Sequence, residues 1–278
     1  MANDEQARFW NETGGPSWVA NEAWFDTMLE PYEAKLESAA AATGAEYVLD
    51  VGCGFGTTTL AMARAVGEEG RVVAYDISEV MAERVRSRAT AAGLTNVLVQ
   101  VGDVQTDPLP AAQFHLAVSR YGVMFFDDPV AAFTNVRQSL LTGGRLAFTC
   151  WQARSRNEFA TAVWQAVAPP GSAITPVQGP GPFAFGDEGF VAEVLSAAGF
   201  VDVRLEPFAA PVVMGGGAGL DAALQQCSGM SEASRILASL DEPGRTAAVG
   251  RLRDMLSAHL IDGAVRLGAM AWIVTART

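Results

Sequence analysis

The chain has 278 residues, of which 50% are hydrophobic and 18% charged. This is enough apolar material for a full core and too much for intrinsic disorder. With 19 Lys and Arg against 31 Asp and Glu, its net charge of −12 argues against nucleic acid or an anionic membrane as the main partner.

Helix-like residues 18–42, predicted as one helix or two broken at Pro31, precede a region of regular alternation. In residues 46–151, short apolar runs alternate with helical patterns, which is typical of a mainly parallel sheet. The predicted strands are Tyr47–Val51, Arg71–Asp76, Asn96–Val101, Phe114–Ser119 and Arg145–Trp151. The predicted helices are Thr57–Val66, Glu79–Ala92 and Pro129–Leu141, the last ended by Gly143 and Gly144.

The second half of the chain has a different pattern. Residues 168–189 are rich in Pro and Gly. A helix at Glu188–Ala198 and a strand at Phe200–Phe208 follow, and Gly215–Gly217 is expected to be a flexible break. Residues 220–261 are predicted as two or three helical pieces interrupted near Glu242, before a last strand at Val265–Ala276.

These patterns predict one core with a helical cover. We expect an N-terminal helical lid in residues 1–45 and the central core in residues 46–151. Residues 152–199 and 209–262 are interpreted as cover insertions, and residues 200–208 and 264–276 as the final core strands.

The strand at Val48–Val51 continues directly into Gly52, Gly54 and Gly56, and a helix starts at Thr57. Glycines permit positive φ and let a ligand lie against bare backbone, while a helix N-terminus offers free N–H groups. The next strand ends at Asp76 and the third at Gly102, Asp103 and Val104. Acids at these two strand ends, one for a ribose and one for an adenine amino group, predict an adenosine site.

The glycine spacing discriminates between nucleotide-binding motifs. Dinucleotide oxidoreductases carry Gly-x-Gly-x-x-Gly, whereas this loop has Gly-x-Gly-x-Gly with Thr57 where the third glycine would fall. No Gly-Lys-Ser/Thr follows, so the loop is not a phosphate-binding P-loop.

Five segments in this order, VLDVGCGFG, YDIS, GDV, SRYGVMFFDDP and LLTGGRLAFTCW, resemble the class I S-adenosylmethionine-dependent methyltransferases. The similarity is greatest to the small-molecule branch that resembles the ubiquinone and menaquinone biosynthesis enzymes. It covers residues 46–151 strongly and the closing GAMAWIVTAR more weakly. The resemblance implies a Rossmann-like, doubly wound α/β fold with a seven-stranded sheet and an antiparallel last strand.

The resemblance also implies site residues. The first cofactor motif, which wraps the methionine part of S-adenosylmethionine, matches Asp50, Gly52, Cys53, Gly54 and Gly56, with Thr57 adjoining it. Asp76 matches the ribose-binding acid, with Ile77 beside the adenine. Asp103 and Val104, after Gly102, match the adenine edge. Ser119, Arg120 and Tyr121 lie where cofactor and acceptor meet in the family. The family commonly has Asp where this chain has His115, which is at the far end of its strand and is interpreted as structural.

Methyl transfer from a sulfonium needs positioning and exclusion of water more than a general base. We interpret Arg120 and Tyr121 as the candidate catalytic residues, the alternatives being a surface arginine and a tyrosine packed under the cover. Met124, Phe125 and Phe126 are either an acceptor pocket or core.

Several other residues carry alternative interpretations. Asp127 and Asp128 are interpreted as a helix cap, not a metal site, and no other metal is expected. Trp10, Trp18 and Trp24 are interpreted equally as a lid over the sulfonium or as ordinary packing. His259, at the edge of an apolar stripe, is interpreted as structural.

The sequence therefore predicts a methyltransferase that acts on an apolar small molecule, such as a quinone, polyketide, terpenoid or aromatic metabolite. The alternatives are an NAD(P)-dependent oxidoreductase and a non-catalytic module that binds an adenosyl cofactor. No nucleic-acid partner and no membrane span are expected, and a homodimer is left open. The spacing of Cys53, Cys150 and Cys227 and the polar N-terminus favour a reducing, cytoplasmic setting.

Overall fold

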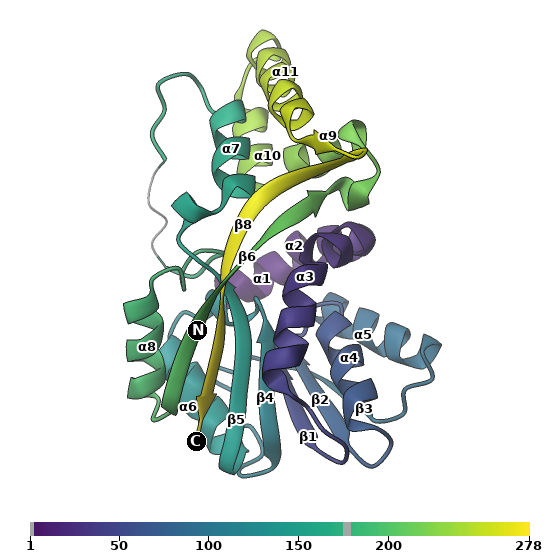
Figure 1. Ribbon diagram of the computed structural model, residues 1–278, viewed down its shortest axis with the longest axis vertical. Helices are drawn as coiled ribbons and strands as arrows, with labels where there is room; N and C mark the ends of the chain where they lie inside the picture. Colours follow the sequence, from purple (N-terminus) through teal and green to yellow (C-terminus); the bar gives the residue numbers. More distant parts are fainter. Residues whose placement is uncertain (1–2, 175–178) are drawn as a thin grey trace.

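A mixed sheet with strand order β3-β2-β1-β4-β5-β8-β6 organises the computed structural model, which describes residues 3–174 and 179–278 (Figure 1). Strands β1 to β5 are parallel, and β8 is antiparallel to both β5 and β6. The strands are β1 Tyr47–Val51, β2 Arg71–Asp76, β3 Val97–Val101, β4 Phe114–Arg120, β5 Leu140–Trp151, β6 Val201–Met214, β7 Leu260–Ile261 and β8 Ala264–Arg277. The predicted α/β class with an antiparallel last strand is confirmed, and the two-residue β7 pairs with β8 beside the seven-stranded path.

Helices cover both faces of the sheet because its strands are apolar on both sides. Val48 packs with α3 and α4 residues such as Leu36 and Met62. Leu49, which points the other way, lies in the cluster that includes Phe133 of α6. The helices are α1 Asp4–Glu12, α2 Gly14–Ala20, α3 Glu22–Ala40, α4 Thr57–Val66, α5 Glu79–Ala91, α6 Pro129–Ser139, α7 Glu158–Val167, α8 Glu188–Ala197, α9 Leu220–Gly229, α10 Ser231–Ser239 and α11 Glu242–Ala258.

Of the two alternatives left open at Pro31, the structure has the unbroken one, because α3 runs without interruption from Glu22 to Ala40. A proline inside a helix removes one backbone hydrogen bond. Here buried residues on both sides of it, including Leu29, Tyr32 and Leu36, anchor the helix to the core. Tertiary packing therefore outweighs the local cost of the proline.

Two other boundaries differ from the prediction, and a third agrees with it. Helix α6 ends at Ser139, and β5 starts at Leu140 and continues through the two glycines that were expected to form a turn. The interruption predicted near Glu242 is confirmed, because α10 ends at Ser239 and α11 begins at Glu242, where Pro243 suits a first helical turn and Asp241 caps the helix. Gly215–Gly217 form a short 3₁₀ turn that packs on α9, where a flexible break was expected.

The sheet extends beyond the core through its last two strands. In Figure 1, β6 and β8 rise from the sheet into a helical block formed by α7, α9, α10 and α11. Helix α8, within predicted cover residues 152–199, instead packs against α6 and β6. Helices α1 to α3 lie near the upper ends of β1 to β4, between the sheet and the block (Figure 1). The carboxyl ends of the parallel strands are thus covered on two sides.

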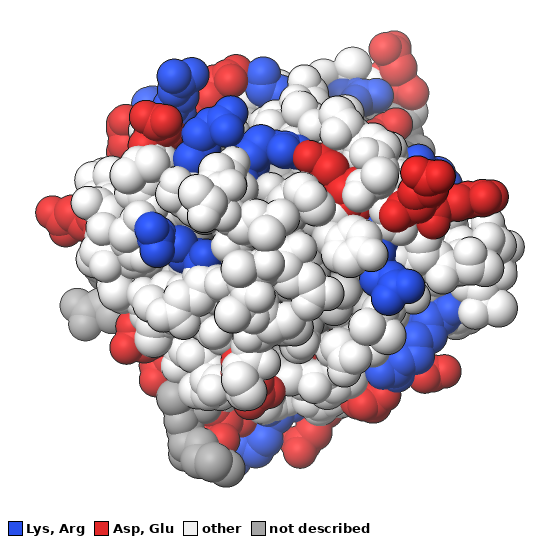
Figure 2. All heavy atoms as spheres, turned by 90° about the horizontal axis from the view of Figure 1, so that it is seen from below, with Lys and Arg blue, Asp and Glu red and all other residues white. Residues whose placement is uncertain are grey.

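The opposite end of the molecule, at the amino ends of the parallel strands, is open to solvent. Figure 2 shows that face, with acidic and basic side chains interspersed around a mostly uncharged centre. Among the described residues, the helices lack the combination of length and apolar character that crossing a membrane would require.

Candidate active site

The loop between β1 and α4 lies at the carboxyl ends of the strands and is shaped by its glycines. Gly52 has φ 64°, and a Cβ there would lie 2.9 Å from the Cα of Gly122, because the loops after β1 and β4 cross at this point. Gly54 has φ 54° and nothing within 4 Å of where its Cβ would be. Gly52 is therefore required by backbone packing, while Gly54 presents bare backbone to open space.

Asp76 at the end of β2 lies against this loop. Its carboxylate accepts hydrogen bonds from the backbone N–H groups of Gly54, at 2.8 Å, and Ser78, at 2.9 Å. Burial raises the pKa of Asp76 to about 6, although the two backbone N–H groups act in the opposite direction. A carboxylate has about four acceptor positions, so capacity remains for two further donors.

The third strand brings a second acid to the same edge. Asp103 accepts from the backbone N–H of Gln105 at 2.9 Å and from the side-chain amide of Asn3 at 3.2 Å. Val104 beside it is buried. The backbone of Gly102 passes so close to Asp107 that a Cβ would lie 2.6 Å from its carboxylate. The structure thus brings together the acids predicted at the ends of the second and third strands.

Helix α1 covers these strand ends. Asn11 donates to the carbonyl of Ile77 at 3.2 Å and accepts from the backbone N–H of Glu79 at 3.0 Å. The hydroxyl of Ser78 donates to the carbonyl of Trp10 at 2.8 Å. The Trp10 ring packs edge-on against Phe125, in the segment that follows β4. In this structure the N-terminal helix lies across the predicted ribose and adenine positions.

Asp50, the last but one residue of β1, is fully buried. The hydroxyl of Thr59 donates to its Oδ2 at 2.6 Å, while its Oδ1 has no partner among the described residues. Burial raises the pKa of Asp50 to about 7, above its ordinary value of 3.8. Nearby, Cys53 is buried and the hydroxyl of Ser119 donates to the carbonyl of Val51 at 2.7 Å.

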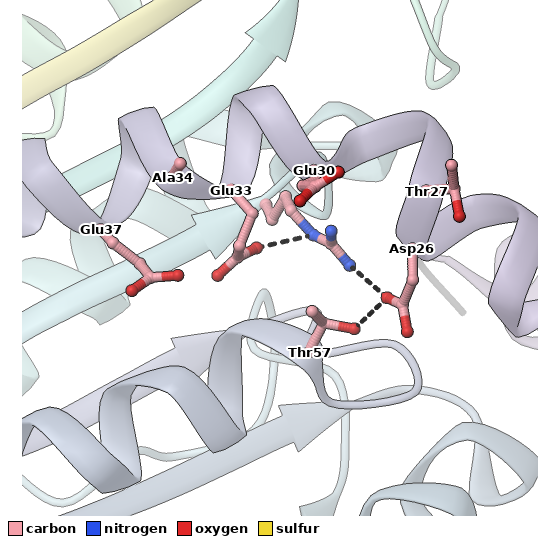
Figure 3. Close-up of a pocket in the computed structure, with 8 residues that line it drawn as sticks. Asp26, Thr27, Glu30, Glu33, Ala34, Glu37 and Thr57 are labelled. Atoms are coloured by element: carbon pink, nitrogen blue, oxygen red, sulfur yellow. Dashed lines mark hydrogen bonds and ion pairs between the residues drawn. The ribbon is translucent and has the colours of Figure 1, made fainter. Parts of the chain in front are cut away.

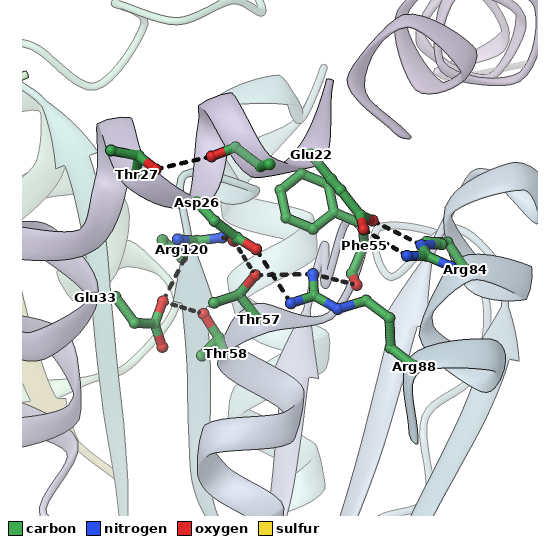
Figure 4. Close-up of polar contacts among 11 residues, drawn as sticks. Glu22, Asp26, Thr27, Glu33, Phe55, Thr57, Thr58, Arg84, Arg88 and Arg120 are labelled. Carbon is green, nitrogen blue, oxygen red and sulfur yellow. Dashed lines mark hydrogen bonds and ion pairs between the residues drawn. The ribbon is translucent and has the colours of Figure 1, made fainter. Parts of the chain in front are cut away.

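Arg120, the last residue of β4, is buried instead of lying at the surface, with 9% of its side chain exposed. Its Nε lies 3.1 Å from Oε2 of Glu33 on α3, and its Nη2 lies 3.9 Å from Asp26. Glu33 also accepts from the hydroxyl of Thr58 at 2.7 Å, and burial raises its pKa. Figure 4 shows the guanidinium between the two acids of α3.

Glu33 was missed by the sequence analysis, although the sequence contains a signal for it. It lies four residues after Leu29 and three before Leu36, so it falls within the apolar stripe of α3. A charged residue at such a position is expected to be buried with a partner. The partner, Arg120, lies far away in the sequence, so the pair could not be deduced from local patterns.

A second arginine extends this network at the start of α4. Thr57 donates to Oδ1 of Asp26 at 2.5 Å, and Arg88 of α5 lies 3.1 Å from the other oxygen of Asp26. Arg88 also donates to the carbonyl of Phe55 at 3.2 Å (Figure 4). The glycine-rich loop is thereby tied to α3 and α5 as well as to β2.

Tyr121 follows Arg120 and has φ 63°, a conformation that is uncommon for a residue other than glycine. Its ring stacks on Trp151 with centroids 4.3 Å apart, and Tyr32 meets it edge-on at 6.1 Å. Its buried hydroxyl has no hydrogen-bond partner among the described residues. Burial raises its pKa well above the ordinary value, so the hydroxyl stays protonated and acts as a donor.

The remaining candidates lie mostly in structural positions. Met124 is buried, and its sulfur accepts from the backbone N–H of Trp151. Asp128 caps α6 by accepting from the N–H of Ala131 at 3.0 Å. His115 accepts from the N–H of Tyr47 at the amino end of the sheet, and His259 lies 3.0 Å from Glu158 in the helical block.

The chain is similar to methyltransferases in both sequence and structure. A family model described as a methyltransferase domain matches residues 48–144. Nocamycin O-methyltransferase of Saccharothrix syringae is 32% identical over 83% of this chain and 84% of its own length. Aklanonic acid methyltransferase DauC of a Streptomyces species is 41% identical over 37% of this chain and 47% of its own length, so less than half of that relative is spanned. The crystal structure of YcgJ from Bacillus subtilis has a TM-score of 0.60 at 18% identity and covers 88% of this chain and 97% of its own.

Proposed function

The chain belongs to the class I S-adenosylmethionine-dependent methyltransferases, and from that premise we propose that it methylates an apolar small-molecule acceptor in the crevice at the carboxyl ends of β1, β2 and β4. The observation that carries this proposal is the arrangement of Gly54 and Asp76. Bare backbone and a carboxylate with spare acceptor capacity lie side by side at adjacent strand ends.

The residues at these strand ends fit an S-adenosyl cofactor. Asp76 would hold the ribose, with Ile77 and the Asp103–Val104 pair at the adenine. The backbone of Gly52 to Gly56, with Cys53 and Thr57, would border the methionine part, and Asp50 and Ser119 would support that loop from below. Gly54 supports this fit because its Cβ direction is open.

When bound, the cofactor supplies a methyl group already activated on a sulfonium. The work left to the chain is to bind, to orient the acceptor and to exclude water. We propose that α1 closes over the site through the contacts of Trp10 and Asn11. The Tyr121 hydroxyl would donate to the polar group of the acceptor, because it is buried, protonated and unpaired among the described residues.

The acceptor side of the crevice is aromatic. Tyr121, Trp151 and Tyr32 form a ring cluster, and Phe159 packs on Trp151 with centroids 5.0 Å apart. Such surfaces favour planar apolar molecules with one polar handle. Nocamycin O-methyltransferase and aklanonic acid methyltransferase DauC, named for their acceptors, are among the relatives, which supports a polyketide or related aromatic acceptor for this chain.

The proposal is tested by titrating the protein with S-adenosylmethionine in a calorimeter and by following methyl transfer to a panel of aromatic polyketides and quinones. Asp76→Asn should weaken binding at least tenfold, because it removes charge-assisted hydrogen bonds worth roughly 1.5–3 kcal/mol each. Asp221→Asn, a matched change on the exposed helix α9 where Asp221 pairs with Arg253, should leave the affinity unchanged. Equal affinities for Asp76→Asn and the wild type would refute the ribose assignment. Binding without transfer to any acceptor would favour a cofactor-binding module instead.

A further inference from the structure

A cleft of about 550 Å³ opens between α3 and the start of α4, beside the glycine-rich loop (Figure 3). One face of α3 lines it with Asp26, Glu30, Glu33 and Glu37, spaced so that successive side chains lie above one another. Thr57 and Arg120 line the other side. Arg88 also pairs with Asp26, so four carboxylates face two guanidinium groups and the cleft keeps an excess of negative charge.

Two groups in the cleft are buried and incompletely paired. Glu33 has 8% of its side chain exposed and Arg120 has 9%. Glu33 uses Oε2 for Arg120 and Thr58, while its Oε1 has no partner among the described residues. Arg120 uses Nε and Nη2 for acids of α3, and its Nη1 is likewise unpaired. Leaving charged groups buried without a partner is costly, so such atoms indicate a ligand.

The unpaired atoms are Oε1 of Glu33 and Nη1 of Arg120. These two residues form an ion pair with each other through other atoms. Together they complement a group that carries a positive amine and a negative carboxylate close together, which is an α-amino acid. The exposed Glu30 and Glu37 add negative potential on the ammonium side. The N-terminus of the ten-residue α4, at Thr57, favours negative charge on the other side.

Resting on the proposed function, we infer that Glu33 and Arg120 form a clamp for the amino-acid end of the adenosyl cofactor, with the ammonium on Glu33 and the carboxylate on Arg120. Asp76 then recognises the nucleoside end and the clamp recognises the amino-acid end, so adenosyl compounds that lack the amino acid are rejected.

Calorimetry with four ligands tests the clamp. The ligands are S-adenosylhomocysteine, methylthioadenosine, which lacks the amino-acid end, S-adenosylmethionine and its decarboxylated form. The wild type should bind S-adenosylhomocysteine at least a hundredfold more tightly than methylthioadenosine. It should also bind S-adenosylmethionine at least tenfold more tightly than the decarboxylated form.

Variants assign each half of the clamp. Glu33→Gln should weaken S-adenosylhomocysteine at least tenfold and methylthioadenosine less than twofold. Arg120→Lys should weaken S-adenosylmethionine but leave the decarboxylated form unchanged. Glu69→Gln, the same change at an exposed position in the turn after α4 and outside the cleft, should alter none of these affinities by more than twofold.

The outcomes separate the two proposals. If neither S-adenosylmethionine nor methylthioadenosine binds the wild type, the proposed function fails. If both nucleosides bind with similar affinity, or if Glu33→Gln weakens both equally, the clamp is wrong while the function stands. The comparison of ligands on the wild type decides the matter even if a variant does not fold. Saturable binding of free methionine alone, as tight as that of S-adenosylmethionine, would show an amino-acid site independent of the cofactor and would also overturn the clamp.

Discussion

At the scale of single residues, the site contains carboxylates held in surroundings that disfavour their charge. Burial raises the pKa of Asp50 to about 7 and that of Asp76 to about 6. Asp50 is fully buried, and among the described residues the hydroxyl of Thr59 is its one hydrogen-bond donor. The ligand-free protein thus tolerates ionised acids that a compact core alone would not favour, as functional sites commonly do.

Asp50→Asn should stabilise the ligand-free protein. Asp50 has a higher pKa in the folded protein than in the unfolded chain, so binding of its proton stabilises the fold. This contribution is fully present below pH 3.8 and is lost as the pH rises through about 7. The amide has no charge to bury and can still accept from Thr59. We expect a gain of about 1 kcal/mol or more at pH 8 in urea unfolding, and a smaller gain at pH 5. A variant less stable than the wild type at pH 8 would contradict this account.

Tyr121 and Tyr32 offer a matched pair of hydroxyls. The hydroxyl of Tyr32 donates to the carbonyl of Ala210 at 2.7 Å, whereas that of Tyr121 is unpaired. Tyr32→Phe should therefore cost about 1 kcal/mol of stability, and Tyr121→Phe should cost none. If Tyr121 contacts the acceptor, its variant should also lower kcat/KM for the acceptor about tenfold while the affinity for S-adenosylmethionine is unchanged. Loss of stability without loss of turnover in Tyr121→Phe would assign it to packing.

At the scale of elements, α1 is attached to the strand ends through few contacts. Asn11 makes two of them, to Ile77 and Glu79, and the segment has no buried residue of its own. A helix with so little buried surface is expected to open more easily than the core. This supports the proposal that α1 acts as a lid, whereas α3, also within residues 1–45, is anchored to the core by residues such as Leu29, Tyr32 and Leu36.

Asn11→Ala should loosen α1 and speed cofactor exchange. We expect the association and dissociation rates of S-adenosylhomocysteine to rise at least threefold each, measured by stopped-flow tryptophan fluorescence. Asn21→Ala is the control, because among the described residues the Asn21 side chain has one hydrogen bond, to the carbonyl of Ser17 in the preceding helix. Rates that match the wild type would show that α1 does not gate the site.

The sequence predicts a helix or strand well where neighbouring residues determine its ends. It predicts less well where packing against distant residues determines them. Strands β1 and β2 have their predicted bounds because a buried strand followed by glycine, or by Asp and a capping Ser78, is a local signal. The continuity of α3 through Pro31 depends on packing of Tyr32 and Leu36 against distant strands, so the local sequence could not decide between one helix and two. The Glu33–Arg120 pair depends in the same way on tertiary structure.

At the scale of the whole molecule, the helical block and the sheet are joined by β6 and β8 and by a few polar contacts. Glu158 at the start of α7 accepts from the N–H of Gly268 in β8 at 2.7 Å, and its other oxygen lies 3.0 Å from His259 at the end of α11. The carbonyl of Met255, and then Glu158, raise the pKa of His259 above 6.5. This contact links three elements of the block.

Stability should therefore depend on the protonation of His259. Because its folded pKa is raised, its contribution is fully present below pH 6.5 and is lost as the pH rises through the folded value. His259→Gln should make the fall in melting temperature above pH 6.5 smaller, and the part of the fall caused by Asp50 as the pH rises through about 7 should remain. Superimposable curves for variant and wild type over pH 6–9 would remove His259 from this role.

The most direct test of the account is a crystal structure with S-adenosylhomocysteine bound. We predict that the ribose hydroxyls lie within hydrogen-bond distance of Asp76. The ligand should contact the backbone of Gly54 and lie under α1. Density for the ligand elsewhere, or a crevice filled by protein side chains at saturating ligand, would contradict the assignment of this site.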